Sequence, residues 1–467
     1  MFAVVLLFGL AIRVMALRSS FAQQDSDRAV VYLMARHVAR GDLRTFYWGQ
    51  GYGGTMLQLT AGALFRLVGS SFVALQIVEI GFWLGACLLV RSIVVRACGV
   101  LVGDVAGCLF WLATPFVLAL SFSDPGFYGS GLVVGLIGVR VAQSVGDRPE
   151  WQVAGAVGLC LGLALWTTPF ALAFTVPAAI WVGARIRAWA PRLIGIGAAV
   201  LGAAPWLWAN EHSGMASLQP QSAGRGSFAS RYWHVFTQVV PAIAGYAPTS
   251  IRGWVVAGLF LFAPFVGVAC ALRRGNIAVG MLCLSAVLVP MLLAGSGAPI
   301  VAEAPRYATF MLPAVVGVLA WMLGRRPLIA MLMILFVASW TFASVWGTTN
   351  GLDRVAEPAT GTPTAQLAAY LEHEGRTAVW ADYWESYLLS AATQERVTAA
   401  AIGTRREPAY EAAAIRPAQT TVVLFAGDAN DHVLGRRRDL PPYHRTRVGT
   451  FAVYVFAGRV DVPAHLH

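Results

Sequence analysis

The sequence contains no lysine, so all 34 of its basic side chains are arginine. Charge of either sign is scarce, because only 12% of the 467 residues are charged while 57% are hydrophobic. A soluble protein typically carries about 25% charged residues. Half that fraction leaves too little polar surface to cover a particle of this size in water. The composition therefore excludes a string of soluble domains and predicts a protein surrounded mainly by lipid, in agreement with its mean hydropathy of +0.64.

Cysteine is also scarce, and its placement excludes two common uses. The six cysteines lie within or beside apolar segments, and none has the spacing of metal ligands. They are Cys87, Cys98, Cys108, Cys160, Cys270 and Cys283. We interpret them as small apolar core side chains. No disulfide framework is expected.

The net charge is +11, and a basic protein first suggests a nucleic-acid partner. The arginines, however, stand in pairs between apolar runs. Three of these pairs are Arg185 with Arg187, Arg273 with Arg274, and Arg325 with Arg326. This is the pattern of cytoplasmic loops in membrane proteins, so we expect no nucleic-acid partner. The exclusive use of arginine with abundant Ala, Gly and Val is typical of a bacterium with a GC-rich genome.

Eleven apolar segments qualify as transmembrane helices, since about 20 apolar residues cross a bilayer core. The segments are 2–17, 72–95, 100–120, 128–145, 153–167, 169–184, 193–209, 253–272, 277–294, 307–324 and 327–346. The division of 153–184 stays open, because Thr167, Thr168 and Pro169 either separate two helices or kink a single long one. The predicted fold class is thus an α-helical polytopic membrane protein with about eleven spans.

The arginine distribution also predicts the orientation. Placing the N-terminus in the cytoplasm puts the arginine pairs on the cytoplasmic side and leaves the short loops 121–127 and 166–170 without a basic residue. With an odd number of spans, the C-terminal segment lies outside an inner or plasma membrane. Two outer loops are long, 18–71 and 210–252.

The first long loop has a helical pattern. Residues 26–40 place apolar side chains on one stripe beside a basic face, which predicts a helix with Asp27 at its start, where a carboxylate caps free N–H groups. Residues 54–68 suit a second amphipathic helix lying in the membrane interface. Between them, FYWGQGYGG is typical of a tight turn at the headgroup level.

The composition changes at residue 348. The remaining 120 residues carry 13 of the 23 acidic side chains. Runs typical of strands (377–381, 396–401, 420–426 and 444–457) alternate with helical stretches (364–374, 384–392 and 407–414). We therefore predict a transmembrane domain at 1–347 and a small extracytoplasmic α/β domain at 348–467. The latter has no phosphate-loop or dinucleotide glycine pattern.

Asp25 and Asp27 form an acidic pair just beyond the first span. Such a pair at a membrane surface fits either metal binding or a general base. The alternative is a helix N-cap plus a solvated charge, since Asp is a favoured cap residue. One carboxylate can also serve both purposes.

The run SDRAVVYLMARHVARGDLRTFYWGQGYGGTMLQLTAGALFRLVG resembles the first outer loop of the GT-C membrane glycosyltransferases that use polyprenyl-phosphate sugars. This branch includes protein O-mannosyltransferases and lipid A aminoarabinose transferases. Three later runs, LGAAPWLWANEHSG, EAPRYATFMLP and ADYWESYLLSAATQERVTAA, are similar to its mid-chain exit, the start of a late span and the opening of its outer domain. Arg28 departs from the pattern, because many relatives have Glu after the Asp.

The resemblance implies an inverting transfer of a sugar from a polyprenyl-phosphate donor to an envelope glycan, lipid or protein, with Asp27 as general base. No nucleotide or other cofactor is required, and the sparse acidic residues leave a divalent metal open. Arg306, beside Tyr307, is the candidate for the donor phosphate, because the guanidinium suits phosphate. Its alternative role is an interfacial arginine reaching the headgroups.

Six further side chains are candidates with simpler alternatives. His37 binds donor phosphate or is a structural histidine, and Glu303 contacts the acceptor, pairs with Arg306 or is a loop charge. Asp124 belongs to the substrate pocket or to a turn. Sugar-pocket candidates that also suit interfacial anchoring are Tyr47, Gln50 and Tyr52.

Two other functions remain open. A transporter or lipid flippase usually shows repeated halves and ionisable residues deep within spans. The sequence shows no internal repeat, and its acids cluster at loop boundaries, with Arg13 in the first span and Glu79 in the second as exceptions that could line a polar cavity. A non-catalytic scaffold that binds envelope glycans would tolerate the loss of Asp27. Membrane lipids are partners in every case.

Overall fold

The computed structural model describes residues 1–18, 22, 24–219, 226–274, 276–324, 326–347, 362–462 and 466. These fall into two compact units. The membrane unit comprises Met1–Phe21, Gly51–Leu57 and Gln76–Asn350, and the C-terminal unit comprises Ala22–Gln50, Gln58–Leu75 and Gly351–His467. The predicted boundary between residues 347 and 348 borders 348–361, which lie outside the described residues. Each unit is described separately below.

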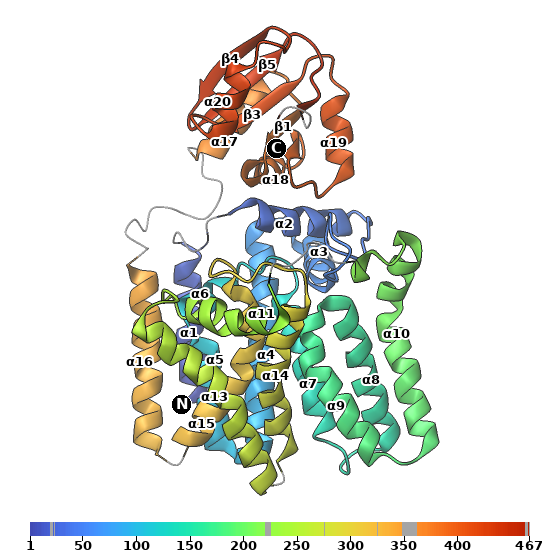
Figure 1. The fold of residues 1–467 in the computed structure, drawn as a ribbon, viewed down its shortest axis with the longest axis vertical. Coiled ribbons are helices and arrows are strands. Elements are labelled where there is room, and N and C mark those ends of the chain that lie inside the picture. Colours follow the sequence, from blue (N-terminus) through green and yellow to red (C-terminus); the bar gives the residue numbers. More distant parts are fainter. Residues whose placement is uncertain are drawn as a thin grey trace. The chain divides into compact units, whose positions relative to one another are not determined.

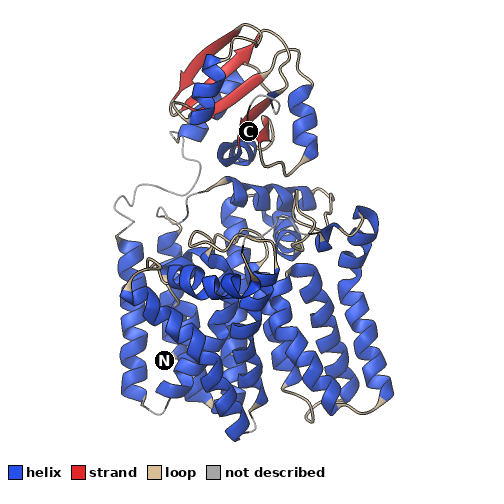
Figure 2. Cartoon of the chain, viewed as in Figure 1, coloured by secondary structure: helices blue, strands red, loops and turns tan. Residues whose placement is uncertain are grey.

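The membrane unit is built from helices, in agreement with the apolar segments of the sequence (Figures 1 and 2). Each predicted segment coincides with a helix, or with two in succession. The helices are α1 (Phe2–Ala16), α4 (Phe72–Cys98), α5 (Val100–Leu112), α6 (Pro115–Leu120), α7 (Tyr128–Ala142), α8 (Glu150–Thr167), α9 (Leu172–Arg185), α10 (Trp189–Ser213), α13 (Ile251–Arg274), α14 (Ile277–Gly295), α15 (Leu312–Leu323) and α16 (Pro327–Trp346).

Six helical stretches of the described chain are long and apolar enough to cross a membrane: Phe72–Cys98, Trp189–Ser213, Ile251–Arg273, Ile277–Gly295, Pro305–Leu323 and Pro327–Trp346. The stretch Pro305–Leu323 includes the 3₁₀ helix η5 (Pro305–Met311) that precedes α15. Several other apolar helices are shorter, among them α1, α5 and α7. The chain is therefore a polytopic membrane protein, while a total of eleven spans stays a prediction.

Residues 153–184 form a hairpin of two helices. Helix α8 ends at Thr167, and Thr168 has an extended backbone that interrupts the helical hydrogen bonds. Pro169 begins a short 3₁₀ helix, η2 (Pro169–Ala171), because its fixed φ suits the start of a helix and its ring cannot continue one. Helices α8 and α9 then pack against each other, so the segment is not a single kinked helix.

Helices α8 and α10 approach each other closely through glycines. A Cβ atom at Gly158 would lie 2.0 Å from the carbonyl oxygen of Gly195, and one at Gly162 would lie 2.1 Å from that of Ala199. Small residues of this kind let backbones touch in a lipid environment, where dispersion contacts hold helices together. A larger side chain at Gly158 would therefore force the two helices apart.

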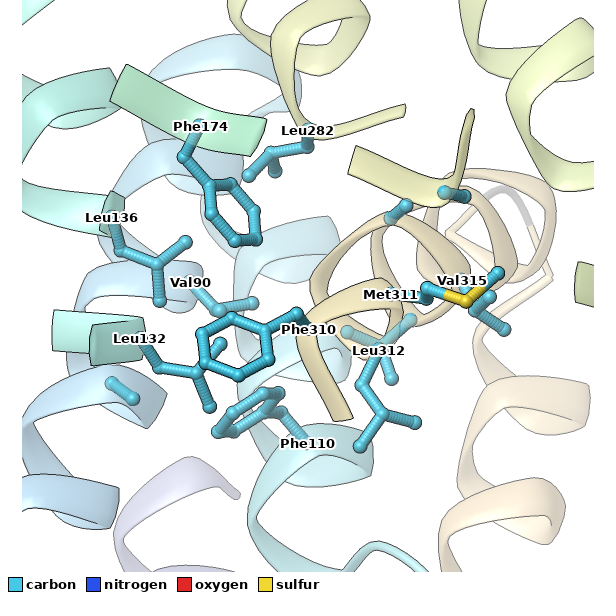
Figure 3. Close-up of a cluster of buried hydrophobic side chains, with 14 of the residues drawn as sticks. Val90, Phe110, Leu132, Leu136, Phe174, Leu282, Phe310, Met311, Leu312 and Val315 are labelled. Atoms are coloured by element: carbon cyan, nitrogen blue, oxygen red, sulfur yellow. The ribbon is translucent and has the colours of Figure 1, made fainter. Parts of the chain in front are cut away.

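The core of the membrane unit is a continuous apolar cluster to which several helices contribute (Figure 3). Phe110 of α5, Leu136 of α7, Phe174 of α9 and Phe310 of η5 are each no more than 2% exposed. Leu132, Leu282, Val90 and Val315 surround them. The cluster fixes helices that are distant in the sequence against one another.

The loop at 210–252 contains helices of its own: η3 (Ala216–Leu218), α11 (Phe228–His234), the π-helix η4 (Val235–Val239) and α12 (Val240–Ile243). Arg231 of α11 is buried and donates hydrogen bonds to the carbonyls of Ala294, Ser296 and Ala298. Ala294 lies in the last turn of α14, where carbonyls have no partner within the helix, and Ser296 and Ala298 follow the helix. One arginine therefore both caps α14 and holds the loop.

The C-terminal unit contains the first-loop helices α2 (Ser26–Ala39) and α3 (Met56–Val68), of which α3 begins in the membrane unit, together with an α/β segment. The segment consists of α17 (Pro363–His373), β1 (Ala378–Asp382), α18 (Tyr383–Ala392), β2 (Thr398–Ile402), α19 (Pro408–Ile415), β3 (Thr421–Phe425), α20 (Ala429–Arg436), β4 (Tyr443–Val448) and β5 (Phe451–Phe456). The sheet order is β2-β1-β3-β5-β4, with β2, β1 and β3 parallel and the last two strands antiparallel.

Most of these elements agree with the sequence pattern. The predicted run 444–457 is a hairpin, because Gly449 takes a positive φ of 58° and turns the chain between β4 and β5. Helix α20 was not predicted. Within this unit α18 packs against the sheet and also against α2 (Figure 1).

Candidate functional site

The two aspartates at the start of the first-loop helix α2 have different roles. Asp25 is the N-cap of α2, and its Oδ1 accepts a hydrogen bond from the backbone N–H of Arg28 at 2.9 Å. The prediction that Asp27 caps the helix was therefore wrong. Asp27 lies in the first turn, where the helix dipole favours a negative charge, and its carboxylate is left for other contacts.

Two side chains of the α/β segment contact the Asp27 carboxylate. The Tyr383 hydroxyl donates a short hydrogen bond to Oδ1. Nη2 of Arg406 lies 3.2 Å from the same oxygen and forms an ion pair with it. Oδ2 accepts no hydrogen bond from any residue that the structure describes. The Asp27 side chain remains 22% exposed, and Oδ2 is not among the buried side-chain atoms of the described residues that lack a partner, so this second oxygen is accessible.

Arg406 is itself held from several sides. Its backbone N–H donates to the Tyr387 hydroxyl at 2.8 Å, and its Nη2 donates to the Tyr383 hydroxyl at 2.9 Å. The guanidinium carbon lies 5.2 Å from the ring centre of Tyr47 and 5.6 Å from that of Tyr383, within the range of cation–π contacts. The side chain is only 13% exposed, so the ion pair is largely shielded from water.

The backbone of Asp27 is also held. Tyr47, which is buried, donates its hydroxyl proton to the Asp27 carbonyl oxygen at 2.9 Å. The Ser26 hydroxyl donates to the Tyr383 carbonyl oxygen. Burial raises the pKa of Tyr383, and the nearby Asp27 charge raises it further. The phenol therefore stays protonated and donates to the carboxylate.

Glu395 contacts the other end of α2. Its carboxylate accepts hydrogen bonds from His37 Nε2 at 2.6 Å, Arg40 Nη1 at 2.8 Å and the Tyr410 hydroxyl at 2.9 Å. Burial alone would raise the pKa of Glu395, but the bond from His37 and the other donors outweigh it and lower the pKa to about 2. Gln394 and Glu395 both have positive φ, a conformation that costs free energy in residues with a side chain.

His37 is held by acidic residues on both sides of its ring. Nε2 bonds to Glu395, and Nδ1 lies 3.1 Å from Oδ2 of Asp42. The hydrogen bond to Glu395 raises the pKa of His37 against the opposing effect of burial. These contacts favour the structural alternative for His37, because binding a phosphate would require one of them to break.

The three sugar-pocket candidates do not lie together in one unit. Tyr47 contacts Asp27 and Arg406, and the Gln50 N–H donates to the Tyr47 carbonyl at 3.1 Å. The Gln50 side-chain oxygen is buried and accepts no hydrogen bond from a described residue. Tyr52 belongs to the membrane unit, where its ring packs edge-on against Phe127 at 6.3 Å.

The remaining candidates lie in the membrane unit. Arg306 stands half-buried in the first turn of η5, with its guanidinium 5.7 Å from the ring centre of Tyr307. Tyr307 packs against Phe170 at 5.5 Å. Glu303 is exposed in the preceding loop. Arg306 therefore lies at the start of a buried aromatic cluster.

Asp124 is fully buried and has a structural role. Its carboxylate accepts hydrogen bonds from the backbone N–H groups of Gly126, Tyr128 and Gly129 at 2.9, 3.1 and 2.6 Å. These are free N–H groups at the start of α7, so the turn alternative is realised. No group of three or more His, Cys, Asp or Glu side chains that could hold a metal ion occurs in the described part of the chain.

Tyr383, Arg406 and Glu395 were not identified as site residues from the sequence. Tyr383 and Glu395 lie in ADYWESYLLSAATQERVTAA, the run that resembles the opening of the outer domain, so a signal was present without an assignment. Arg406 stands in a polar loop beside Arg405 and carries no pattern of its own.

The comparisons with known proteins agree with this architecture. No model of a protein family matches the sequence, and no curated protein matches it by sequence. The fold, in contrast, is similar to that of membrane glycosyltransferases of the GT-C superfamily. The apo structure of ArnT from Cupriavidus metallidurans superposes with a TM-score of 0.64 at 12% identity, covering 100% of this chain and 98% of ArnT.

Two further structures are similar. Arabinofuranosyltransferase AftD from Mycobacteria has a TM-score of 0.57 at 14% identity, covering 98% of this chain and 40% of AftD. An oligosaccharyltransferase of Archaeoglobus fulgidus has a TM-score of 0.54 at 11% identity, covering 97% of this chain and 72% of that protein. At these identities the likeness concerns the fold: this chain has the GT-C fold.

Proposed function

We propose that this chain is an inverting glycosyltransferase, in which Asp27 acts as the general base. The donor is a sugar on a polyprenyl phosphate, and the acceptor is an envelope glycan, lipid or protein outside the cytoplasm. The proposal rests on one observation: a partly exposed carboxylate stands in the first turn of the first-loop helix, with one oxygen held and the other accessible, in a chain with the GT-C fold.

The proposed reaction is a single displacement at the anomeric carbon of the sugar. The acceptor oxygen forms a bond to this carbon while the bond from the carbon to the phosphate oxygen breaks. The electron pair leaves with the polyprenyl phosphate, and the acceptor proton passes to Asp27. A base in this position typically contributes about 10²–10⁴-fold. Attack opposite the leaving group inverts the anomeric centre.

The leaving phosphate needs a cation, and Arg306 is the proposed one, with Tyr307 beside it. Arg306 is half-buried, and its guanidinium lies 5.7 Å from the ring centre of Tyr307. The donor class has support in the structural neighbours: one ArnT structure contains undecaprenyl phosphate, and an AglB structure with a TM-score of 0.50 contains a dolichol-phosphate.

The proposed topology follows the arginine distribution. All eleven apolar segments cross the membrane, the N-terminus is cytoplasmic, and residues 348–467 lie outside. Cysteine labelling from the outside tests this: a single cysteine at exposed His373 is expected to react with an impermeant maleimide in intact cells, and one at Arg148 is not. The reverse result would invert the topology and remove the outer acceptor.

Transfer is tested with the purified chain in lipid nanodiscs, radiolabelled polyprenyl-phosphate sugars and an envelope extract. Asp27→Asn is compared with Asp25→Asn, a matched control that keeps the helix cap because Asn caps as well as Asp. We expect transfer by wild type and Asp25→Asn and its loss in Asp27→Asn. Transfer that survives in Asp27→Asn removes the proposed base. No transfer by wild type with any donor favours the transporter or scaffold alternatives.

A further inference from the structure

Two side chains of the α/β segment, Tyr383 and Arg406, hold the carboxylate that the proposed function uses as its base. We propose that both are positioning residues for Asp27, so that the C-terminal segment is part of the catalytic site and not an accessory domain. This inference rests on the proposed role of Asp27 and goes beyond it, since it assigns a catalytic task to residues more than 350 positions away in the sequence.

The two carboxylate oxygens of Asp27 differ in their hydrogen-bond partners. An ionised carboxylate has about four lone-pair positions, two on each oxygen. Oδ1 accepts from both the Tyr383 hydroxyl and Arg406 Nη2, so its positions are occupied. Oδ2 accepts from no described residue. The proton of the acceptor hydroxyl is therefore directed to Oδ2, and the two donors on Oδ1 fix the plane of the carboxylate as that proton arrives.

The two donors, Tyr383 and Arg406, are held in place by their neighbours. Tyr383 is the first residue of α18, whose N-cap Asp382 accepts a hydrogen bond from the Trp384 N–H at 2.9 Å. The Arg406 guanidinium contacts the rings of both Tyr47 and Tyr383, at 5.2 and 5.6 Å from their centres. Side chains that are locked by such neighbours hold a reacting group within a few tenths of an ångström, which catalysis requires.

The contacts of Tyr383 and Arg406 with Asp27 do more than hold α2 against the α/β segment. At the other end of α2, the Glu395 carboxylate accepts hydrogen bonds from His37 and Arg40. These contacts already hold the helix against the α/β segment. Two further donors on Asp27, the neutral Tyr383 hydroxyl and the charged Arg406 guanidinium, are not needed for that purpose. Their common target is a single oxygen of the proposed base, while the other oxygen stays accessible. This one-sided arrangement is what an oriented base requires.

The test compares kcat and the KM for donor in Tyr383→Phe, Arg406→Gln and Arg406→Lys, all in nanodiscs. The matched control is Arg405→Gln, the neighbouring arginine, which is half exposed and pairs with Glu411 instead. We expect kcat to fall about 10-fold in Tyr383→Phe and about 100-fold in Arg406→Gln, since small misplacements of a base are costly. Arg406→Lys recovers part of the loss because an ammonium group still donates, and the KM for donor stays within about twofold.

A double variant gives the sharpest readout. If Tyr383 acts through Asp27, Tyr383→Phe lowers the residual rate of Asp27→Asn no further, because the two residues act as a unit. Thermal unfolding midpoints of all variants are measured beside the rates. A fall of kcat that follows a fall in the midpoint, with Lys no better than Gln at position 406, indicates a structural role only and overturns the inference.

Failure of this inference is distinguishable from failure of the proposed function. Full kcat in both Tyr383→Phe and Arg406→Gln, together with an inactive Asp27→Asn, removes the positioning role and leaves the base in place. An active Asp27→Asn, or a wild type without transfer, removes the proposed function itself and this inference with it.

Discussion

The Tyr383 hydroxyl donates a hydrogen bond to Oδ1 of Asp27, which joins two residues 356 positions apart in the sequence. The contact places the first-loop helix and the C-terminal α/β segment in one compact unit. The first loop is thus more than an amphipathic connection lying in the membrane interface. Its helix is held at one end by Tyr383 and Arg406 and at the other by Glu395.

Glu395 and the side chains that donate to it, His37, Arg40 and Tyr410, form a cluster that makes the stability of the C-terminal unit depend on pH. The pKa of His37 is raised in the folded protein, so its contribution is fully present below its unfolded pKa of about 6.5 and is lost as the pH rises through the folded value. The pKa of Glu395 is lowered to about 2, so its contribution is present above about pH 4.3 and adds no slope at neutral pH. A charge-assisted bond of this kind is worth about 1.5–3 kcal/mol.

We therefore expect the thermal unfolding midpoint of the full chain to fall between pH 6 and pH 9, and to fall less in His37→Gln. The measurement is a melting series in nanodiscs for both proteins. Equal slopes in the two proteins would show that His37 does not carry the pH dependence. Arg36, Arg40 and Asp42 also contact this cluster. Burial alone would raise the pKa of Asp42, but the hydrogen bond from His37 lowers it, away from that range.

Asp124 is expected to matter for stability. Asp124→Ala leaves three buried N–H groups at the start of α7 without their acceptor, and each such loss costs about 1–3 kcal/mol. Asp124→Asn keeps one acceptor oxygen and should cost less. The thermal midpoint of each variant checks the order. A midpoint of Asp124→Ala equal to that of wild type would contradict the structural role.

The architecture was largely predictable because it depends on local patterns. Apolar runs located the helices, and short runs of strand-like composition located the strands. Helix α20 was not predicted because it is short and polar, and only Asp431 and Leu434 are buried among its residues. The hairpin at Gly449 was predicted as one run because both of its strands have strand-like composition.

The site was only half predictable. Asp27 stands in a patterned loop, whereas Arg406 stands in a polar loop, and their contact across 379 positions leaves no periodic signal. Spacing alone also could not assign the cap, because Asp25 and Asp27 are equally good cap residues. Backbone geometry decided it in favour of Asp25. Long-range polar contacts become visible only when the chain is folded.

Arg306 is expected to bind the donor phosphate. Arg306→Ala should raise the inhibition constant of free polyprenyl phosphate, measured in competition with the donor, about 10–100-fold, the range of a lost charge-assisted hydrogen bond. The KM for acceptor should be unchanged. Arg252 is the matched control, because it also lies over an aromatic ring, that of Tyr246, at 6.0 Å. Equal inhibition constants for Arg306→Ala and Arg252→Ala would count against the phosphate role.

The most direct test is the single-turnover rate of sugar transfer by Asp27→Asn, measured beside Asp25→Asn with saturating polyprenyl-phosphate donor. Asn keeps the shape of the side chain and removes its ability to take a proton. The account predicts a rate about 10²–10⁴-fold below wild type for Asp27→Asn and a rate near wild type for Asp25→Asn. A rate for Asp27→Asn that equals the wild-type rate would contradict it.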